Sequence, residues 1–256
     1  MKVSKSELTA LLKQVFEGLG FACGEHENAA NMIVWAQMSG LDGLSELARG
    51  LPYLVAQPHI PLQCVADDEA HAVLDAGGSS GLNCADVAIN LAYVKALASG
   101  SSSVTVLNCH NRKLLGKAIM DCGDRAMACM MYWSDASDPT LKHTLSIAPH
   151  STTGVLPRYT LNRVKQQSNV GQLHQQSLFI HCSSQWQQLE ELLSSVLYPR
   201  QEELNVIEPE TMRDNYRCAL SHGLTMEKDL WQRLQELAQI VLVESSEQSR
   251  MGAGAK

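Results

Sequence analysis

The apolar residues of the first sixty positions recur at helical spacing, and this pattern constrains the fold more than any other feature of the sequence. Ser4 and Glu7 have the spacing of a capping box, which favours a helix that starts directly afterwards. The same periodicity returns in two further segments, one beginning near Glu25 and one that Pro58 and Pro61 end. The sequence therefore opens with three predicted helices.

Beyond this segment the periodicity changes to the short apolar runs that are typical of strands. Strands are predicted at residues 63–67, 71–75, 103–107, 126–133, 144–148 and 177–182. Helices are predicted between them at about 83–99 and 113–122. This order favours an α/β fold of the mixed α+β kind, with helical terminal segments around a central mixed sheet.

The chain divides into four predicted regions. These are an N-terminal helical segment (1–60), a central α/β sheet region (61–183), C-terminal helices that pack back on the N-terminal segment (184–250) and a disordered tail (251–256). The C-terminal helices are expected near 185–197, from Pro209 in a first-turn position, and from Thr225 to about Ser245. The polar stretch 163–176 is interpreted as a surface connection.

Charge and hydropathy exclude two classes of partner. Twenty Lys and Arg residues against 27 Asp and Glu residues give a net charge of -7, spread without basic blocks, so neither a nucleic acid nor an anionic membrane is expected as a partner. The longest apolar runs are too short to span a bilayer. The polar N-terminus carries no export signal, and we therefore expect a cytoplasmic protein.

The eight cysteines are expected to be reduced thiols, mostly buried, because the chain is large and has no export signal. Neither a Cys-x-x-Cys pair nor a His-x-x-x-His pair occurs, so no intrinsic metal site is predicted. The glycine cluster at 77–81 does not have Gly-x-Gly-x-x-Gly spacing. It favours a plain strand-to-helix loop over a phosphate cradle.

Several stretches, in the same order along the chain, resemble one known family. They are residues 36–44, 51–54, 73–78, 96–100, 104–110, 213–220, 223–225, 230–231, 234 and 237–238. The family is that of the type 2 malate/L-lactate dehydrogenases, which includes ureidoglycolate dehydrogenase, diketogulonate reductase and reductases of cyclic imino acids. The resemblance implies the family's fold, an NAD(P) cofactor, a small 2-oxo, 2-hydroxy or cyclic imino acid as substrate, and a homodimer with its site at the twofold interface.

Two departures from the family pattern indicate a degraded active site. Where the family has Ser-His-Gly, this chain has Leu41-Asp42-Gly43, so the histidine that handles the substrate proton is absent. The string Ser221-His222-Gly223 lies in the C-terminal region, and we treat it as coincidence. The chain is also shorter between His150 and Ser177, where the family's Asp-x-x-x-Ser and Gly-Lys segments would be expected.

His110 and Asp42 are the candidate catalytic residues. The end of the strand at Asn108-Cys109-His110 looks like the family's Asn-x-x-His with one residue fewer, and a histidine there can donate a proton near neutral pH. The alternative is that His110 only caps the strand. Asp42 would replace the lost histidine only if burial raised its pKa, and otherwise satisfies nearby amide groups. Cys109 is interpreted as a small buried thiol.

Asn108 and Arg112 are the candidate substrate-binding residues. Arg112 and Lys113 are suited to a substrate carboxylate, although both also fit a solvated first helical turn. The polar loop 149–154 lies near the family's cofactor region, and no individual cofactor ligand can be chosen. Two functions therefore remain open, an NAD(P)-dependent reductase that uses His110 and a non-catalytic homologue that acts as a binding or accessory protein.

The cysteine interpretation predicts that all eight thiols are free. Rapid alkylation of the protein in denaturant without reductant, followed by intact-mass measurement, is expected to show eight modified thiols. A prior reduction step, as the control, should leave this number unchanged. Fewer than eight modifications, restored to eight by the reductant, would reveal disulfides.

Overall fold

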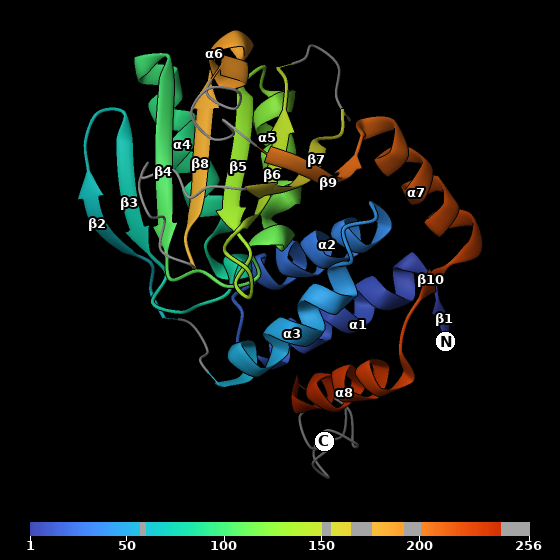
Figure 1. Cartoon of the computed structure of the whole chain (residues 1–256). Helices are drawn as coiled ribbons and strands as arrows, with labels where there is room; N and C mark the ends of the chain where they lie inside the picture. The colour runs from blue at the N-terminus through green and yellow to red at the C-terminus, as the bar shows by residue number, and fades with distance from the viewer. Residues whose placement is uncertain (57–59, 150–154, 165–175, 192–200, 242–256) are drawn as a thin grey trace, which may run out of the picture.

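The computed structural model describes residues 1–56, 60–149, 155–164, 176–191 and 201–241 (Figure 1). It consists of one large twisted sheet with helices behind it, and a group of helices from both ends of the chain below one edge of the sheet. The predicted surface connection lies outside the described residues from 165 to 175, and so does the predicted tail at 251–256.

Three N-terminal helices form as the apolar periodicity predicts. They are α1 (Lys5–Gly18), α2 (Glu25–Met38) and α3 (Gly43–Ala56). The capping box is complete, since the Glu7 amide donates to Ser4 Oγ at 3.2 Å and the Ser4 amide donates to Glu7 Oε2 at 2.7 Å. Each helix buries its apolar face in a common core.

The main sheet has eight strands. They are β2 (Gln63–Asp67), β3 (His71–Asp75), β4 (Ser101–Leu107), β5 (Ala128–Ser134), β6 (Leu141–Ile147), β7 (Arg158–Val164), β8 (Leu178–Ser183) and β9 (Gln201–Ile207). Their spatial order is β2-β3-β4-β8-β5-β6-β7-β9, and only the β3–β4 pair is parallel. The predicted fold class, a mixed sheet between helical terminal segments, is confirmed.

Two of these strands were not expected from the sequence, which has no strand prediction at 158–164 or 201–207. In β7 each face has buried residues, and those of one face are the polar Thr160 and Asn162, so apolar and polar residues do not alternate in the usual way. Strand β9 lies at the end of the sheet and is rich in glutamate, which hides it from a search for apolar runs.

The remaining helices lie behind the sheet, at its upper end, beside β9 and below the N-terminal helices (Figure 1). They are α4 (Ala85–Ser99), α5 (Ala118–Asp124), α6 (Trp186–Glu191), α7 (Pro209–His222) and α8 (Lys228–Ala238), with 3-10 helices η1 (Gly81–Asn83), η2 (Arg112–Lys117) and η4 (Gln239–Val241). Pro209 occupies the first turn of α7, as predicted. Helix α8 begins three residues later than predicted, and the remainder of that prediction beyond residue 241 lies outside the described residues, as does that of α6 beyond 191.

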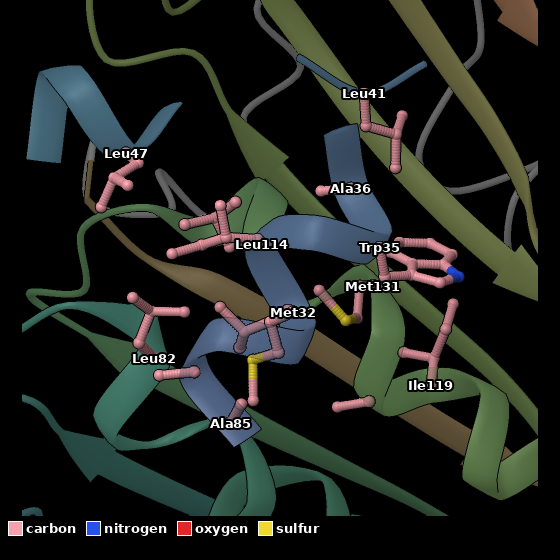
Figure 2. Close-up of a cluster of buried hydrophobic side chains, with 14 of the residues drawn as sticks. Met32, Trp35, Ala36, Leu41, Leu47, Leu82, Ala85, Leu114, Ile119 and Met131 are labelled. Carbon is pink, nitrogen blue, oxygen red and sulfur yellow. The ribbon is translucent and has the colours of Figure 1, made fainter. Parts of the chain in front are cut away.

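Segments from the N-terminal and C-terminal parts of the chain lie side by side. The short strand β1 (Lys2–Val3) pairs with β10 (Leu224–Thr225), and α8 packs against α1 (Figure 1). The core between sheet and helices contains Met32, Trp35, Leu114, Ile119 and Met131 (Figure 2). Of the helices in the described ranges, none combines the length and the apolar character needed to cross a membrane.

The contact between α2 and α3 depends on a residue without a side chain. A Cβ atom at Gly43 would touch the carbonyl oxygen of Ile33 and lie 2.7 Å from the Gln37 nitrogen, so only glycine permits this approach. We expect Gly43→Ala to destabilise the protein by about 1–3 kcal/mol. A protein of this size should then melt about 2–4 °C lower per kcal/mol.

Differential scanning calorimetry measures this effect. The control is Ser45→Ala, because Ser45 is exposed on the same helix and reports any general effect of alanine in α3. Ser45→Ala should melt within a degree or two of the wild type. Equal melting temperatures for all three proteins would contradict the close-contact explanation.

Candidate functional site

The ends of three strands meet at one edge of the sheet, next to α3. Strands β4 and β5 both run antiparallel to β8, and β3 is parallel to β4, so the carboxyl ends of β3, β4 and β5 lie on the same side. The residues that follow these strands include Asn108, His110 and Asp135. Crevices beside the carboxyl ends of strands are the usual place for ligands in open α/β sheets.

Arg112 ties two of these strand ends together. Its guanidinium is buried, and it donates to the Cys109 carbonyl at 3.3 Å and to the Ser134 carbonyl at 3.1 Å. Burial lowers the pKa of Arg112, although the group remains a cation at neutral pH. Arg112 was predicted to bind substrate. These contacts hold the chain between β4 and β5 in place, and substrate binding by Arg112 stays a prediction.

His110 lies just beyond β4 and is half-buried. Its amide donates to the Ser79 carbonyl at 3.0 Å, and its carbonyl accepts from the Gly81 amide at 2.7 Å, so its backbone is fixed on both sides. The imidazole stacks on the exposed ring of Tyr53 in α3, with centroids 4.4 Å apart and an angle of 12°. Partial burial and the charge of Arg112 lower the pKa of His110 below its usual 6.5, so the ring is mostly neutral at pH 7.

The other two predicted residues occupy turns. Asn108 is exposed, has a positive φ of 50°, and donates from Nδ2 to Asp75 Oδ1 at 2.9 Å. Asp42 is also exposed, with a φ of 55°, and its carbonyl accepts from the Glu46 amide at 3.0 Å in the first turn of α3. Asp42 and Tyr53 are separated by most of α3, about 16 Å along the helix axis. The structure therefore does not bring Asp42 and His110 into one centre.

The glycine cluster forms the predicted loop between β3 and α4. The Gly77 amide donates to Asp75 Oδ1, the Gly78 amide to the Asn108 carbonyl and the Gly81 amide to the His110 carbonyl. Because these donors are used within the protein, they are not arranged to hold a phosphate. The loop instead supports the backbone on which Asn108 and His110 lie.

A second group of polar side chains, which sequence reasoning missed, lies farther along the same edge. His143 Nδ1 is 2.8 Å from the Tyr159 hydroxyl, and His143 Nε2 is 3.4 Å from Asp135 Oδ2. The imidazole also stacks on Trp133, with centroids 5.1 Å apart and parallel rings. Asp135, His143 and Tyr159 therefore form a chain of carboxylate, imidazole and phenol, called the Asp-His-Tyr chain below.

The protonation states in this chain follow from burial and hydrogen bonding. Burial opposes ionisation of Asp135, but hydrogen bonds from Ser137, Asp138 and His143 lower its pKa to about 2. Burial lowers the pKa of His143 to about 4, against the attraction of Asp135. Burial and nearby carboxylates raise the pKa of Tyr159. At pH 7 the chain thus holds an ionised carboxylate, a neutral imidazole and a neutral phenol.

Lys113 and Glu46 connect the Asp-His-Tyr chain to α3. Lys113 Nζ lies 5.4 Å from the centroid of the Tyr159 ring. Burial raises the pKa of Glu46, while the charges of Arg49, its ion-pair partner, and of Lys113 oppose that shift. Asn111 Nδ2 donates to the Glu46 carbonyl at 2.9 Å, so the segment that carries His110 and Lys113 runs alongside α3.

One sequence signal points to the Asp-His-Tyr chain. His143 shares its side of β6 with Leu145 and Ile147, so the alternation places a histidine at a core position. A buried polar side chain needs hydrogen-bond partners, and those partners are Asp135 and Tyr159. The predicted strand at 144–148 began one residue too late to include His143.

Comparison with known proteins establishes the fold and does not establish a family. A family model described as "Protein of unknown function (DUF3726)" matches residues 3–92, and no curated protein matches the chain. The chain is similar to the structure of malate dehydrogenase from Pyrococcus horikoshii OT3, with 15% identity, coverage of 95% of this chain and 96% of that one, and a TM-score of 0.67.

Two further structures show the same likeness. A dehydrogenase from Sinorhizobium meliloti has 13% identity, coverage of 93% and 99%, and a TM-score of 0.69. Delta1-piperideine-2-carboxylate reductase from Pseudomonas syringae pvar. tomato has 13% identity, coverage of 93% and 99%, and a TM-score of 0.59. The resemblance to malate/lactate dehydrogenases thus holds at the level of the fold, over nearly the whole chain.

The shifted pKa of His143 predicts a pH-dependent stability. Unfolded His143 binds a proton near pH 6.5, whereas the folded residue stays neutral down to about pH 4. The unfolded state therefore binds more protons between these values, and the wild type should lose about 2 kcal/mol from this residue at pH 5. His143→Gln is expected to be about 1–3 kcal/mol less stable than the wild type at pH 7.5.

The stability difference between wild type and His143→Gln should shrink when the pH falls from 7.5 to 5, because the variant lacks the proton-linked loss. Urea unfolding at both pH values measures this difference. His222→Gln, at an exposed position at the end of α7, is the control and should keep a constant difference. A difference between wild type and His143→Gln that does not change with pH would show that His143 is not held neutral by the fold.

Proposed function

We propose that this chain is an NAD(P)-dependent oxidoreductase of small 2-oxo or 2-hydroxy acids or of cyclic imino acids, with a site that differs from the Ser-His-Gly pattern of the family it resembles. The main support for this proposal is the environment of His110. Its ring is half-buried, stacked on Tyr53 and mostly neutral at pH 7, and it lies at the carboxyl edge of the sheet. The fold and the printed names of similar structures support the substrate class.

His110 would act as the acid and base. In the oxidation of a 2-hydroxy acid, the neutral imidazole accepts the hydroxyl proton, and in reduction the imidazolium returns it. Because its pKa is lowered, the base form dominates at neutral pH. Oxidation should therefore be independent of pH above about 7 and fall in acid, whereas reduction should become faster as the pH falls toward the pKa of His110.

Lys113 is a better candidate than Arg112 for binding the substrate carboxylate. Arg112 was predicted for this role together with Asn108, but its guanidinium donates to two backbone carbonyls and fixes the segment in which His110 lies. Lys113 is only partly buried and lies beside the Asp-His-Tyr chain. Asn108 remains a proposed substrate contact, since its side chain is exposed next to the strand end.

The fit to a nicotinamide cofactor is incomplete in the described residues. When bound, the cofactor would supply or accept the hydride. Its diphosphate needs several amide or cationic donors, and the amides of Gly77, Gly78 and Gly81 already donate within the protein. The loop 149–154, which the family resemblance places near the cofactor, lies outside the described residues from 150 onward.

Two observations favour the second candidate function, a non-catalytic homologue that acts as a binding or accessory protein. Asp42 stands where the family has its histidine, and its side chain is exposed rather than enclosed in a site. The glycine-loop amides are engaged. Such a protein would keep the fold and bind a small acid without turnover.

A homodimer is part of the proposal, and an apolar stripe on α4 supports it. Val87, Val94 and Leu97 are 55%, 59% and 60% exposed and recur at spacings of seven and three residues, on or near one side of the helix. Sedimentation equilibrium at tens of micromolar should give twice the chain mass, and Val94→Lys should shift the protein toward the monomer. A monomeric wild type would rule out the dimer.

The reductase proposal predicts that His110→Gln lowers kcat/KM by about a hundred- to ten-thousand-fold, because a general acid or base contributes on that scale. The assay follows NADH and NADPH absorbance with a panel of 2-oxo, 2-hydroxy and cyclic imino acids. His222→Gln is the matched control and should keep full activity. Circular dichroism should show that both variants remain folded.

Cofactor fluorescence separates the two candidate functions. Binding of NADH or NADPH with turnover of one substrate class supports the reductase, and the absence of both in the folded wild type supports the non-catalytic homologue. Activity that is equal in wild type and His110→Gln would defeat the assignment of His110.

A further inference from the structure

Three cysteines meet in the core at the edge of the sheet opposite to the candidate site. Cys122 comes from α5, Cys129 from the beginning of β5 and Cys182 from the end of β8. Their sulfur atoms all lie within 4.8 Å of one another, and the Cys129 and Cys182 sulfurs are 3.5 Å apart. Each residue is at most 1% exposed. We call this group the thiol triangle.

The backbone holds the thiol triangle in place. Cys129 and Cys182 are direct partners in the β5–β8 pairing, so their side chains lie on the same face of the sheet. The Cys122 carbonyl accepts from the amides of Arg125 and Met127 at 3.1 and 2.9 Å, in a turn where Ala126 has a φ of 57°. This turn folds α5 back onto β5 and brings Cys122 to the other two thiols.

The size of the triangle suits a metal ion bound by three thiolates. A metal–sulfur bond of about 2.3 Å places three sulfurs about 4.0 Å apart when the ion lies at the centre of their plane. The sulfur atoms lie within 4.8 Å of one another, and the separation between those of Cys129 and Cys182 is 3.5 Å, so distances near this value need only small adjustments. Small side-chain movements would therefore create three equal bonds. No helix or strand would have to move.

We propose that the thiol triangle is a binding site for a soft monovalent cation, copper(I). In the part of the chain that the structure describes, no histidine or carboxylate joins the three sulfurs in this group. Structural zinc almost always takes four ligands, whereas thiolates in a dry pocket are a set that copper(I) prefers. No sequence motif indicates the thiol triangle, because each ligand comes from a different secondary-structure element.

Binding of copper(I) by three thiols releases protons and leaves a negatively charged complex. Each thiol that becomes a ligand releases one proton to solvent, so one copper(I) and three thiols yield a three-thiolate complex with a net charge of -2 and three protons. Arg125 lies 4.9 Å from the centroid of the Tyr93 ring and bonds Asn90, which keeps its positive charge near Cys122.

The test uses the full chain with its three exposed cysteines replaced, as Cys23→Ser, Cys64→Ser and Cys218→Ser, so that surface thiols do not contribute. Copper(I) is added anaerobically in competition with a chromophoric copper(I) chelator, both to the folded protein and during refolding, because the site is buried. We expect one copper(I) per chain and an ultraviolet thiolate-to-copper charge-transfer band.

Single replacements in this background locate the site. Cys129→Ala should weaken copper(I) binding at least about a hundredfold, as loss of a thiolate ligand requires. Cys84→Ala is the matched control, since Cys84 is equally buried and its sulfur lies 3.8 Å from that of Cys109, outside the thiol triangle. This control should bind copper(I) like its parent. Circular dichroism confirms folding, and Cys182→Ala replaces Cys129→Ala if the latter does not fold.

Three outcomes would overturn the proposal. The first is a folded parent protein that loses all copper(I) to the chelator under both loading conditions. The second is binding that survives Cys129→Ala or Cys182→Ala but is lost in Cys84→Ala, which would place the ion at the Cys84–Cys109 pair. The third is a preference for zinc over copper(I) at equal free concentration, which would refute the three-coordinate assignment.

Discussion

A buried guanidinium sets the geometry of the candidate site. Removing an arginine side chain from water is costly unless carbonyls or carboxylates surround it. Arg112 meets this requirement by bonding the carbonyls that follow β4 and end β5, with the charges of Asp135 and Glu46 nearby. The segment between these strands is therefore fixed at both ends, and the positions of His110 and Lys113 follow from it.

The sequence predicts those parts of the fold that depend on local pattern. Residues that cap a helix or repeat along its face lie within a few positions of each other, which is why the capping box at Ser4 and the first turn at Pro209 could be identified. Strand β9 was not predicted, because its pairing with β7 depends on a partner about forty residues away. Its own composition resembles that of a solvated segment.

In the candidate site, too, only the residues that depend on local pattern could be predicted. His110 can be identified from local sequence alone, because it follows a clear apolar strand. The Asp-His-Tyr chain forms only when β5, β6 and β7 lie side by side, so no short motif encodes it. The role of Arg112 was equally hidden, since its partners are backbone carbonyls, which every residue has.

The two outer strands of the sheet have a consequence for how copies of this chain can meet. Among the described strands, β2 and β9 each have one neighbour, which leaves one side of their backbones without a strand partner. The pairing of β2 with β3 is irregular between Cys64 and Ala66, and β9 carries Glu202 and Glu203. A distorted strand and charged side chains on an outer strand both disfavour extension of a sheet from one molecule into the next. The protein can thus keep a wide sheet whose described outer strands disfavour polymerisation through it.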